Sequence, residues 1–326
     1  MTTITVNQAI ADAIAEEMRR DERVLLLGEG VATKHHALAA EFGAARVRNT
    51  PLAEAVIAGT AVGAAASGLR PVVDLLFAPF LTYAMDALVN SAGKLRYVSG
   101  GQFQFPLVAI ALTGAGWAVG AQHNHNVEAW FAHAPGLKVI MPSSAADFKG
   151  LLKAAIRDHN PVLFFVDLAL SGTEGDVADG DAALVPIGQA ALRRAGRDVT
   201  LVSYAKTVGT CLAAAQTLAD EGIEAEVIDL RTIKPWDRAA VLGSVSKTGR
   251  LVVVHEAAGP FGVGAEVAAV VAAEAFDALK APVRRLTGPD APAASSWVLE
   301  QAGVPQADAV VQTVREVVGA DAETLA

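Results

Sequence analysis

The stretch Asn49–Phe77 reads NTPLAEAVIAGTAVGAAASGLRPVVDLLF and predicts a helix followed closely by a buried strand. Thr50 can cap the helix and Pro51 can open it, because a threonine oxygen accepts a free N–H group and proline needs no donor in the first turn. The residues from Pro71 to Phe77 form a run of strand length that is apolar except for Asp74. A strand without polar alternation is typical of a parallel sheet covered on both faces. The stretch therefore indicates one unit of an α/β fold.

Helical stretches and apolar strands alternate along most of the chain. In the first half, further strands are expected at Val24–Leu27, Pro106–Leu112, Leu137–Met141 and Pro161–Val166. The chain then turns polar and acidic without periodicity, and we interpret residues 176–190 as an interdomain linker. Beyond the linker, strands are expected at Val199–Tyr204, Glu226–Leu230, Leu251–Glu256 and Val283–Leu286. The predicted fold class is α/β, with two doubly wound domains over residues 1–175 and 191–326.

The composition limits the class of protein. With 326 residues and 52% hydrophobic side chains, the chain has the length of about two domains. A formal charge of −9 argues against binding to nucleic acid. The N-terminal residues lack a continuous apolar core, so neither a signal peptide nor a membrane anchor is expected there, and the chain is expected to be cytoplasmic. The single cysteine, Cys211, suits a reducing compartment, and its apolar neighbours favour helix packing over a role as nucleophile.

Glu54 is the only acid of the helix that follows Pro51. From Ala55 to Val73 the sole charged residue is Arg70, so this carboxylate stands at the head of an almost wholly apolar helix. A buried carboxylate must be hydrogen-bonded or protonated, and both conditions are common at functional sites. The alternative is a first-turn acid that complements the helix dipole. The residues of this helix leave both interpretations open.

Several motifs in sequence order carry a resemblance to a known family. They begin with Thr50–Glu54 and Gly68–Pro71 and continue through Gln122–His123, Pro135–Val139, Lys149–Asp158, Val227–Arg231 and Leu286–Asp290. In these motifs the chain resembles the β subunits of pyruvate, branched-chain 2-oxo acid and acetoin dehydrogenases, which depend on thiamine diphosphate. The resemblance implies a pyrimidine-binding transketolase-like domain over residues 1–175 and a C-terminal transketolase-like domain over residues 191–326. It also implies decarboxylation of a 2-oxo acid and transfer of the acyl group to lipoamide.

The resemblance assigns roles to four residues. Glu54 matches the glutamate that hydrogen-bonds the aminopyrimidine of the cofactor and promotes deprotonation of the thiazolium. Phe80 matches the aromatic residue that packs on the aminopyrimidine, with ordinary core packing between sheet and helix as the alternative. Glu29 matches a glutamate near the cofactor, with a solvated loop acid as the alternative. His123 matches the histidine that donates a proton during acyl transfer, and the alternative for His123 and His125 is a metal-binding pair.

Part of the expected cofactor site is missing from this sequence. We find no Gly-Asp-Gly motif followed by paired asparagines, which in the family holds Mg²⁺ and the diphosphate. The resemblance therefore implies an α subunit that carries this site, in an α2β2 assembly, and a lipoyl acyltransferase as a further partner. It also implies a potassium site, built largely from backbone carbonyls, at Leu107, Ala155, Ile156, Asp158 and Asn160.

The sequence departs from the family pattern near the expected substrate. Ile110 stands where many of these subunits have an arginine, Trp117 and Ala118 interrupt a frequent glycine run, and Asn124 follows His123 where serine is usual. Two alternatives to the leading function therefore remain. One is an acetoin-cleaving or carboligating half-enzyme, and the other is a non-catalytic binding subunit.

Overall fold

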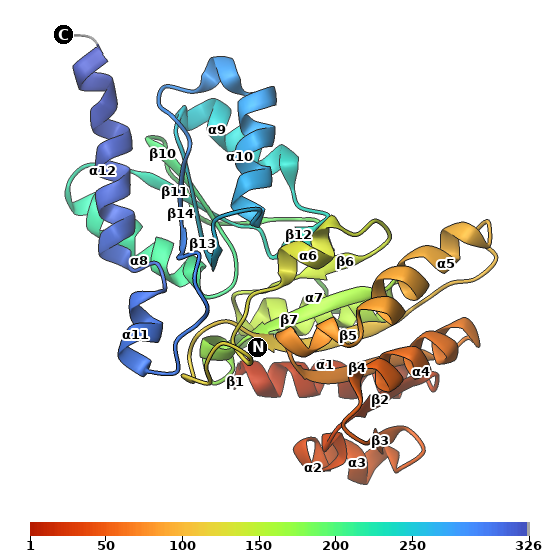
Figure 1. Ribbon diagram of the computed structural model, residues 1–326. Helices are drawn as coiled ribbons and strands as arrows, with labels where there is room; N and C mark the ends of the chain where they lie inside the picture. Colours follow the sequence, from red (N-terminus) through yellow and green to blue (C-terminus); the bar gives the residue numbers. More distant parts are fainter. Residues whose placement is uncertain (325–326) are drawn as a thin grey trace. The chain divides into compact units, whose positions relative to one another are not determined.

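The computed structural model describes residues 1–324, with side chains described through Gly319, and it divides into two compact units. The first unit comprises residues 1–113 and 122–187. The second comprises residues 114–121 and the chain from Gly188 onward. Each unit is built on a mainly parallel sheet with helices, as the predicted fold class requires (Figure 1).

The sheet of the first unit has the strand order β6-β7-β5-β4-β2-β3, and all of these neighbours are parallel. In chain order the strands are β2 (Val24–Gly28), β3 (Val47–Asn49), β4 (Arg70–Phe77), β5 (Val108–Thr113), β6 (Lys138–Ile140) and β7 (Val162–Asp167). Five of them confirm expected strands. The sixth, β3, was not expected because it is only three residues long and two of these are exposed.

Helices bury both faces of this sheet. On one face, Leu26 and Ile110 belong to a buried cluster with α1 and α7. Val73 and Phe165 are also buried, and they lie on the other face because they alternate along their strands with residues of that cluster. The Phe165 ring packs against Phe131 of α6, with centroids 6.4 Å apart. The helices of the unit are α1 (Val6–Arg20), α2 (Val31–Lys34), α3 (His36–Phe42), α4 (Glu54–Ala66), η1 (Ala78–Thr82), the π-helix η2 (Asp86–Ala92), α5 (Gly93–Val98), α6 (Glu128–His133), α7 (Ala145–Arg157) and η3 (Leu168–Leu170).

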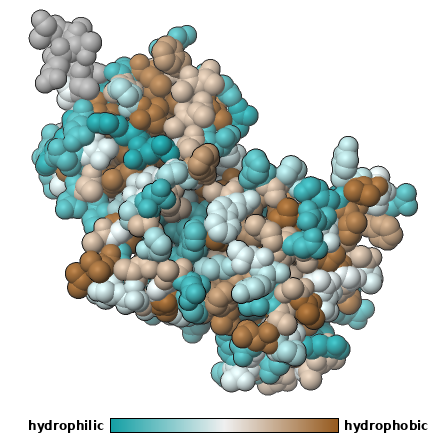
Figure 2. Space-filling model, viewed as in Figure 1, coloured by the Kyte–Doolittle hydropathy of each residue, from teal (hydrophilic) through white to brown (hydrophobic). Residues whose placement is uncertain are grey.

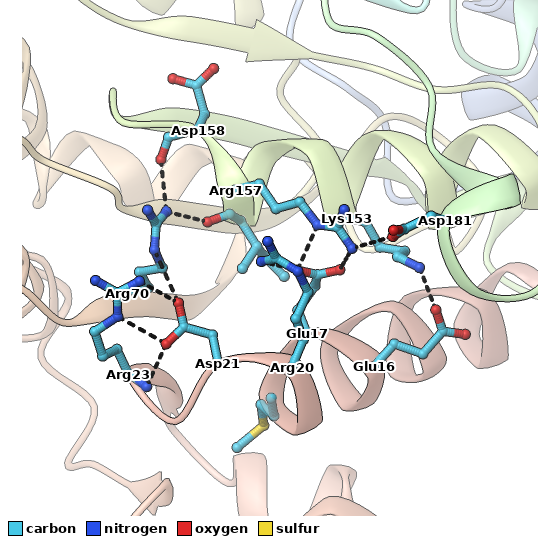
Figure 3. Close-up of polar contacts among 12 residues, drawn as sticks. Glu16, Glu17, Arg20, Asp21, Arg23, Arg70, Lys153, Arg157, Asp158 and Asp181 are labelled. Carbon is cyan, nitrogen blue, oxygen red and sulfur yellow. Dashed lines mark hydrogen bonds and ion pairs between the residues drawn. The ribbon is translucent and has the colours of Figure 1, made fainter.

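Most of the segment interpreted as a linker is folded onto the first unit. It overlaps β8 (Glu174–Val177), which pairs antiparallel with β1 (Thr2–Thr5), and contains η4 (Gly180–Ala183). Two basic residues of α7 hold η4. Lys153 Nζ donates to Gly180 O at 2.6 Å. Arg157 forms an ion pair with Asp181 at 2.7 Å (Figure 3). The compact units divide at Ile187 and Gly188, near the end of the segment. The acidic composition thus reflects ion pairing with α7 in addition to solvation.

The second unit has the strand order β14-β13-β10-β11-β9, in which only β9 is antiparallel to its neighbour. Its strands are β9 (Ala191–Arg194), β10 (Val199–Ser203), β11 (Ala225–Asp229), β13 (Leu251–Ala258) and β14 (Arg284–Gly288), and the short β12 (Thr232–Lys234) follows β11 in the chain. Its helices are α8 (Thr207–Asp220), α9 (Arg238–Thr248), α10 (Val263–Glu274), η5 (Phe276–Ala278), α11 (Trp297–Ala302) and α12 (Ala307–Thr324). The four strands expected here are confirmed.

Cys211 lies in the core of the second unit. Its side chain on α8 is fully buried in a cluster with Leu218, Val254 and Val314. Burial raises the pKa of the thiol to about 12, because the charged thiolate would lose its hydration. A thiol that stays protonated is a poor nucleophile, so the packing interpretation is confirmed.

His255 makes the stability of the second unit depend on pH. The ring on β13 is fully buried, and Nε2 accepts a hydrogen bond from Gly264 N at 3.2 Å. Burial lowers the pKa of His255 to about 4. Below about pH 6.5 the unfolded chain therefore binds a proton at this residue, whereas the folded chain does not bind it until about pH 4. Stability is therefore lost as the pH falls through this window. We expect the His255 share of the unfolding free energy to fall by about 2 kcal/mol between pH 7 and pH 5.

Denaturant unfolding at the two pH values measures this loss. His255→Gln should lower the stability at pH 7 and reduce the difference between pH 7 and pH 5, while His36→Gln, at an exposed position, should keep the full difference. An unchanged pH dependence in His255→Gln would show that other groups cause it.

No helix among the described residues combines the length and the apolar character needed to cross a membrane. On the face shown in Figure 2, hydrophobic side chains are interspersed with hydrophilic ones and form no continuous belt.

Candidate functional site

The residues matched by the resemblance follow the carboxyl ends of adjacent strands in the first unit. Glu29 follows β2, Glu54 follows β3, Phe80 follows β4, and His123 lies beyond β5 in the chain. The sheet order β5-β4-β2-β3 makes these strands neighbours, and all run parallel. Ligands of open parallel sheets bind at this edge. The topology therefore supports one site for residues separated by up to 94 positions in the sequence.

A bend at the end of β4 redirects the chain toward Phe80. The pairing with β5 shifts register between Asp74 and Phe77, and Leu76 adopts a left-handed conformation with φ of 59°. Asp74, which is buried, accepts a hydrogen bond from Leu76 N at 3.0 Å and forms an ion pair with Lys34 at 2.5 Å. The left-handed region is unfavourable for a leucine, so these contacts stabilise a strained turn. The turn leads directly into η1, which carries Phe80.

Phe80 and His123 meet in an aromatic cluster with Phe77. The His123 ring lies 5.0 Å from the Phe77 ring and 5.2 Å from the Phe80 ring, both edge to face. Phe77 and Phe80 are themselves 6.0 Å apart at 89°. All three side chains are half-buried, so each ring keeps part of its surface accessible. The structure thus brings together two of the predicted site residues, Phe80 and His123. Phe77 is a third member of this cluster, and the sequence indicated it only as the end of a strand.

Glu54 begins α4, but the expected helix start was wrong. The N-cap is Ala53, no side chain caps the helix, and Pro51 lies outside it. Thr50 serves another purpose, because its N–H donates to Gly28 O at 2.9 Å. This bond links the segment to the end of β2, beside Glu29, and the helix begins only at Glu54. Thr50 Oγ1 is buried without a hydrogen-bond partner, so the site retains an unused polar atom.

The two histidines of the His-x-His pair have different neighbours. His125 packs against Trp130 at 5.1 Å, and partial desolvation of the ring lowers its pKa. Within residues 1–324, His, Cys, Asp and Glu form no group of three or more that could hold a metal ion. The metal-binding alternative therefore has no support in the described part of the chain. The aromatic surroundings of His123 instead suit a group that acts beside an organic ligand.

The oxygens expected to bind potassium already accept hydrogen bonds from the chain. Arg70 Nη1 donates to Ile156 O at 2.8 Å and to Asp158 O at 3.1 Å (Figure 3). Leu107 O accepts from Val162 N at 2.8 Å, and Ala155 O accepts from Asp158 N at 3.2 Å. The side-chain oxygen of Asn160 accepts from Arg96 at 2.6 Å. A guanidinium group thus lies against two of the expected ligands. The potassium site stays a prediction.

The comparisons with known proteins agree with this geometry. The family model "Transketolase, pyrimidine binding domain" matches residues 2–170, and "Transketolase, C-terminal domain" matches residues 188–310. The chain is 46% identical to the pyruvate dehydrogenase E1 component subunit beta of Rhizobium meliloti strain 1021, over 97% of this chain and 70% of the relative. The chain belongs to the family of pyruvate dehydrogenase E1 β subunits. It is therefore a component of a thiamine-diphosphate-dependent 2-oxo acid dehydrogenase.

Other E1 β subunits match over comparable lengths. The chain is 44% identical to the subunit of Rickettsia felis, over 96% of this chain and 98% of the relative. It is 45% identical to subunit beta-2, mitochondrial, of Oryza sativa subsp. japonica, over 96% of this chain and 85% of the relative. A solved structure described as a split gene transketolase, inactive β4 tetramer, is 26% identical with a TM-score of 0.82 and covers 97% of this chain and 98% of that one. The E1 β family thus accounts for both units, implies thiamine diphosphate as cofactor, and implies association with an E1 α subunit.

Proposed function

We propose that this E1 β subunit contributes half of a site that decarboxylates pyruvate and passes the acetyl group to lipoamide. The observation that carries the proposal is the ring contact between Phe80 and His123, together with the position of Glu54 after a strand of the same parallel sheet. The curated relatives named as pyruvate dehydrogenase components support pyruvate as the substrate. The single buried cysteine suits a reducing compartment, and we place the chain in the cytoplasm.

The residues present fit the aminopyrimidine end of the cofactor. Glu54 offers a half-buried carboxylate that can hold or move a proton, and Phe80 offers a partly accessible ring against which a flat heterocycle can pack. When bound, thiamine diphosphate supplies the carbon nucleophile that attacks the 2-oxo group and stabilises the charge released on decarboxylation. Glu29, which is exposed at the end of β2, is available to the same ligand. His123 supplies a proton donor beside Phe80.

The exposed side of α4 supports an α subunit as the partner. Val56 is 67% exposed, and a Cβ added at Gly59 or Gly63 would meet no atom within 4 Å. Because the helix is apolar all round, this side gains free energy only by packing against another chain. The partner that holds the diphosphate and Mg²⁺ must approach the residue at which α4 begins, Glu54. We therefore propose that the α subunit covers this side, in an α2β2 assembly, and that a lipoyl acyltransferase receives the product.

Val56→Asp is expected to weaken assembly with the α subunit by at least about tenfold, because a charge would be desolvated in an apolar interface. The isolated chain should stay folded, since the side chain is exposed within it. Size-exclusion chromatography over a range of concentrations measures the assembly, and circular dichroism measures the fold. Leu192→Asp, at a position on β9 that is 60% exposed, is the matched control. Equal assembly of the two variants would place the interface elsewhere.

His123→Ala tests the proposed function. In the assembled α and β subunits, decarboxylation of pyruvate with an artificial electron acceptor should change by less than about threefold. Acetyl transfer to a lipoyl domain should fall by about 100-fold, because the transfer loses a positioned proton donor. His133→Ala, at a histidine on α6, is the control. Equal loss of both reactions would remove the role of His123, and a wild-type assembly that cannot acetylate the lipoyl domain would overturn the proposed function.

A further inference from the structure

Two carboxylates of the second unit bind the backbone of the glycine-rich loop Gly114–Ala121. Ala115 N donates to Glu256 Oε1 at 2.5 Å. Gly116 N donates to Glu300 Oε2 at 3.1 Å, and Ala118 N donates to Glu300 Oε1 at 3.0 Å. Glu300 therefore holds two N–H groups with its two oxygens. Bonds from a backbone N–H to an ionised carboxylate are stronger than neutral ones.

The carboxylates are shielded from solvent. Glu300, on the six-residue helix α11, is 4% exposed. Glu256, at the end of β13, forms an ion pair with Lys206 at 2.5 Å. Lys206 Nζ also donates to Ala115 O at 2.6 Å, so both polar groups of the Ala115 backbone are bonded to this pair. A buried carboxylate is costly unless its oxygens are satisfied, and the loop supplies donors for both residues.

The loop conformation requires this support. Gly114, Ala118 and Gly120 have φ values of 80°, 51° and 81°, in the left-handed region. For Ala118 this conformation is unfavourable, because the Cβ crowds the carbonyl oxygen that follows. Glycines also lose much conformational freedom when they are ordered. Hydrogen bonds to Glu256 and Glu300 offset these costs, and the two glutamates come from elements that follow the loop by more than 130 residues.

We propose that Glu300 and Glu256 are positioning residues for His123. The last bonded residue of the loop, Ala118, precedes His123 by five residues, so holding this backbone restricts the segment that carries the histidine. The ring itself packs edge to face against Phe77 and Phe80. Proton transfer requires the donor to be within hydrogen-bond reach, and small displacements are costly. This inference rests on the proposed function, because it assigns the two carboxylates to the acyl-transfer step.

Glu300→Ala, in the assembled α and β subunits, tests the proposal. We expect amide hydrogen exchange in residues 114–121 to accelerate by at least about tenfold, with exchange in α10 unchanged. Acetyl transfer to the lipoyl domain should fall about tenfold in kcat, while decarboxylation with an artificial acceptor stays within about twofold. Glu300→Gln, which keeps one acceptor oxygen and is the safer variant for folding, should give smaller changes in the same directions. Glu266→Ala, at an exposed position on α10, is the control.

Two results would overturn the positioning role. Unchanged exchange in residues 114–121 of both Glu300 variants would show that the carboxylate does not hold the loop. Faster exchange with an equal fall in both reactions would show a structural role without a specific effect on His123. If the wild-type assembly transfers no acetyl group, the proposed function and the acyl-transfer role fail together. The exchange measurement still decides separately whether Glu300 holds the loop.

Discussion

Glu54→Gln is expected to lower kcat of the assembled enzyme by about 10³-fold, because the amide cannot take part in the proton transfer that the cofactor requires. Glutamine has nearly the same size, and Glu54 is half-buried at the start of α4, so the fold should persist. Decarboxylation with an artificial electron acceptor measures the rate. Calorimetric titration of thiamine diphosphate measures binding, which should weaken far less than the rate falls.

The helix-dipole interpretation of Glu54 predicts a different result. A first-turn acid that only complements the dipole contributes about 0.3–1 kcal/mol to stability, so its replacement would leave kcat nearly unchanged. Glu22→Gln is the control, since this exposed acid lies just before β2, at the opposite end of the strand from Glu29. Retention of more than about a tenth of kcat by Glu54→Gln would rule out a required proton transfer at this carboxylate.

Arg157→Met is expected to lower the free energy of unfolding by about 3 kcal/mol, because it leaves a buried carboxylate without its main partner. Glu17 on α1 is 1% exposed, and Arg157 binds both of its oxygens, at 2.9 and 2.7 Å (Figure 3). The hydrogen bonds that Arg157 donates to Glu17, and with smaller effect to Asp181, raise the pKa of Arg157 above its ordinary value. Asp181 of η4 would lose its ion pair as well. Denaturant unfolding monitored by circular dichroism measures the loss.

The double variant Glu17→Met and Arg157→Met shows whether the unpaired charge is the cause. It should be less destabilised than the sum of the two single variants, because it leaves no buried charge behind. Arg19→Met, at an exposed ion pair with Glu41, is the control and should cost at most about 1 kcal/mol. Strictly additive effects of the two replacements at Glu17 and Arg157 would contradict this account.

The sequence alone was sufficient for the fold class and for the candidate residues. Apolar runs of strand length predicted β2, β4 and β5, because strands buried on both faces consist largely of apolar residues. Glu54 stood out because a charge at the head of an apolar helix is costly. The motifs around it identified the family. Short or partly exposed elements such as β3 and β9 gave no such pattern and could not be predicted.

The tertiary structure decided how these residues are held, because bonds between distant segments leave no periodic pattern in the sequence. Thr50 has the chemistry of a cap, yet its N–H donates to Gly28 O at the end of β2. The helix begins four residues later, at Glu54. The acidic segment near Asp181 has the composition of a linker, yet two basic residues of α7 bind it. Glu300 reads as an ordinary helix acid, yet it holds the loop that leads to His123. Sequence determined which groups are available, and folding determined which donor meets which acceptor.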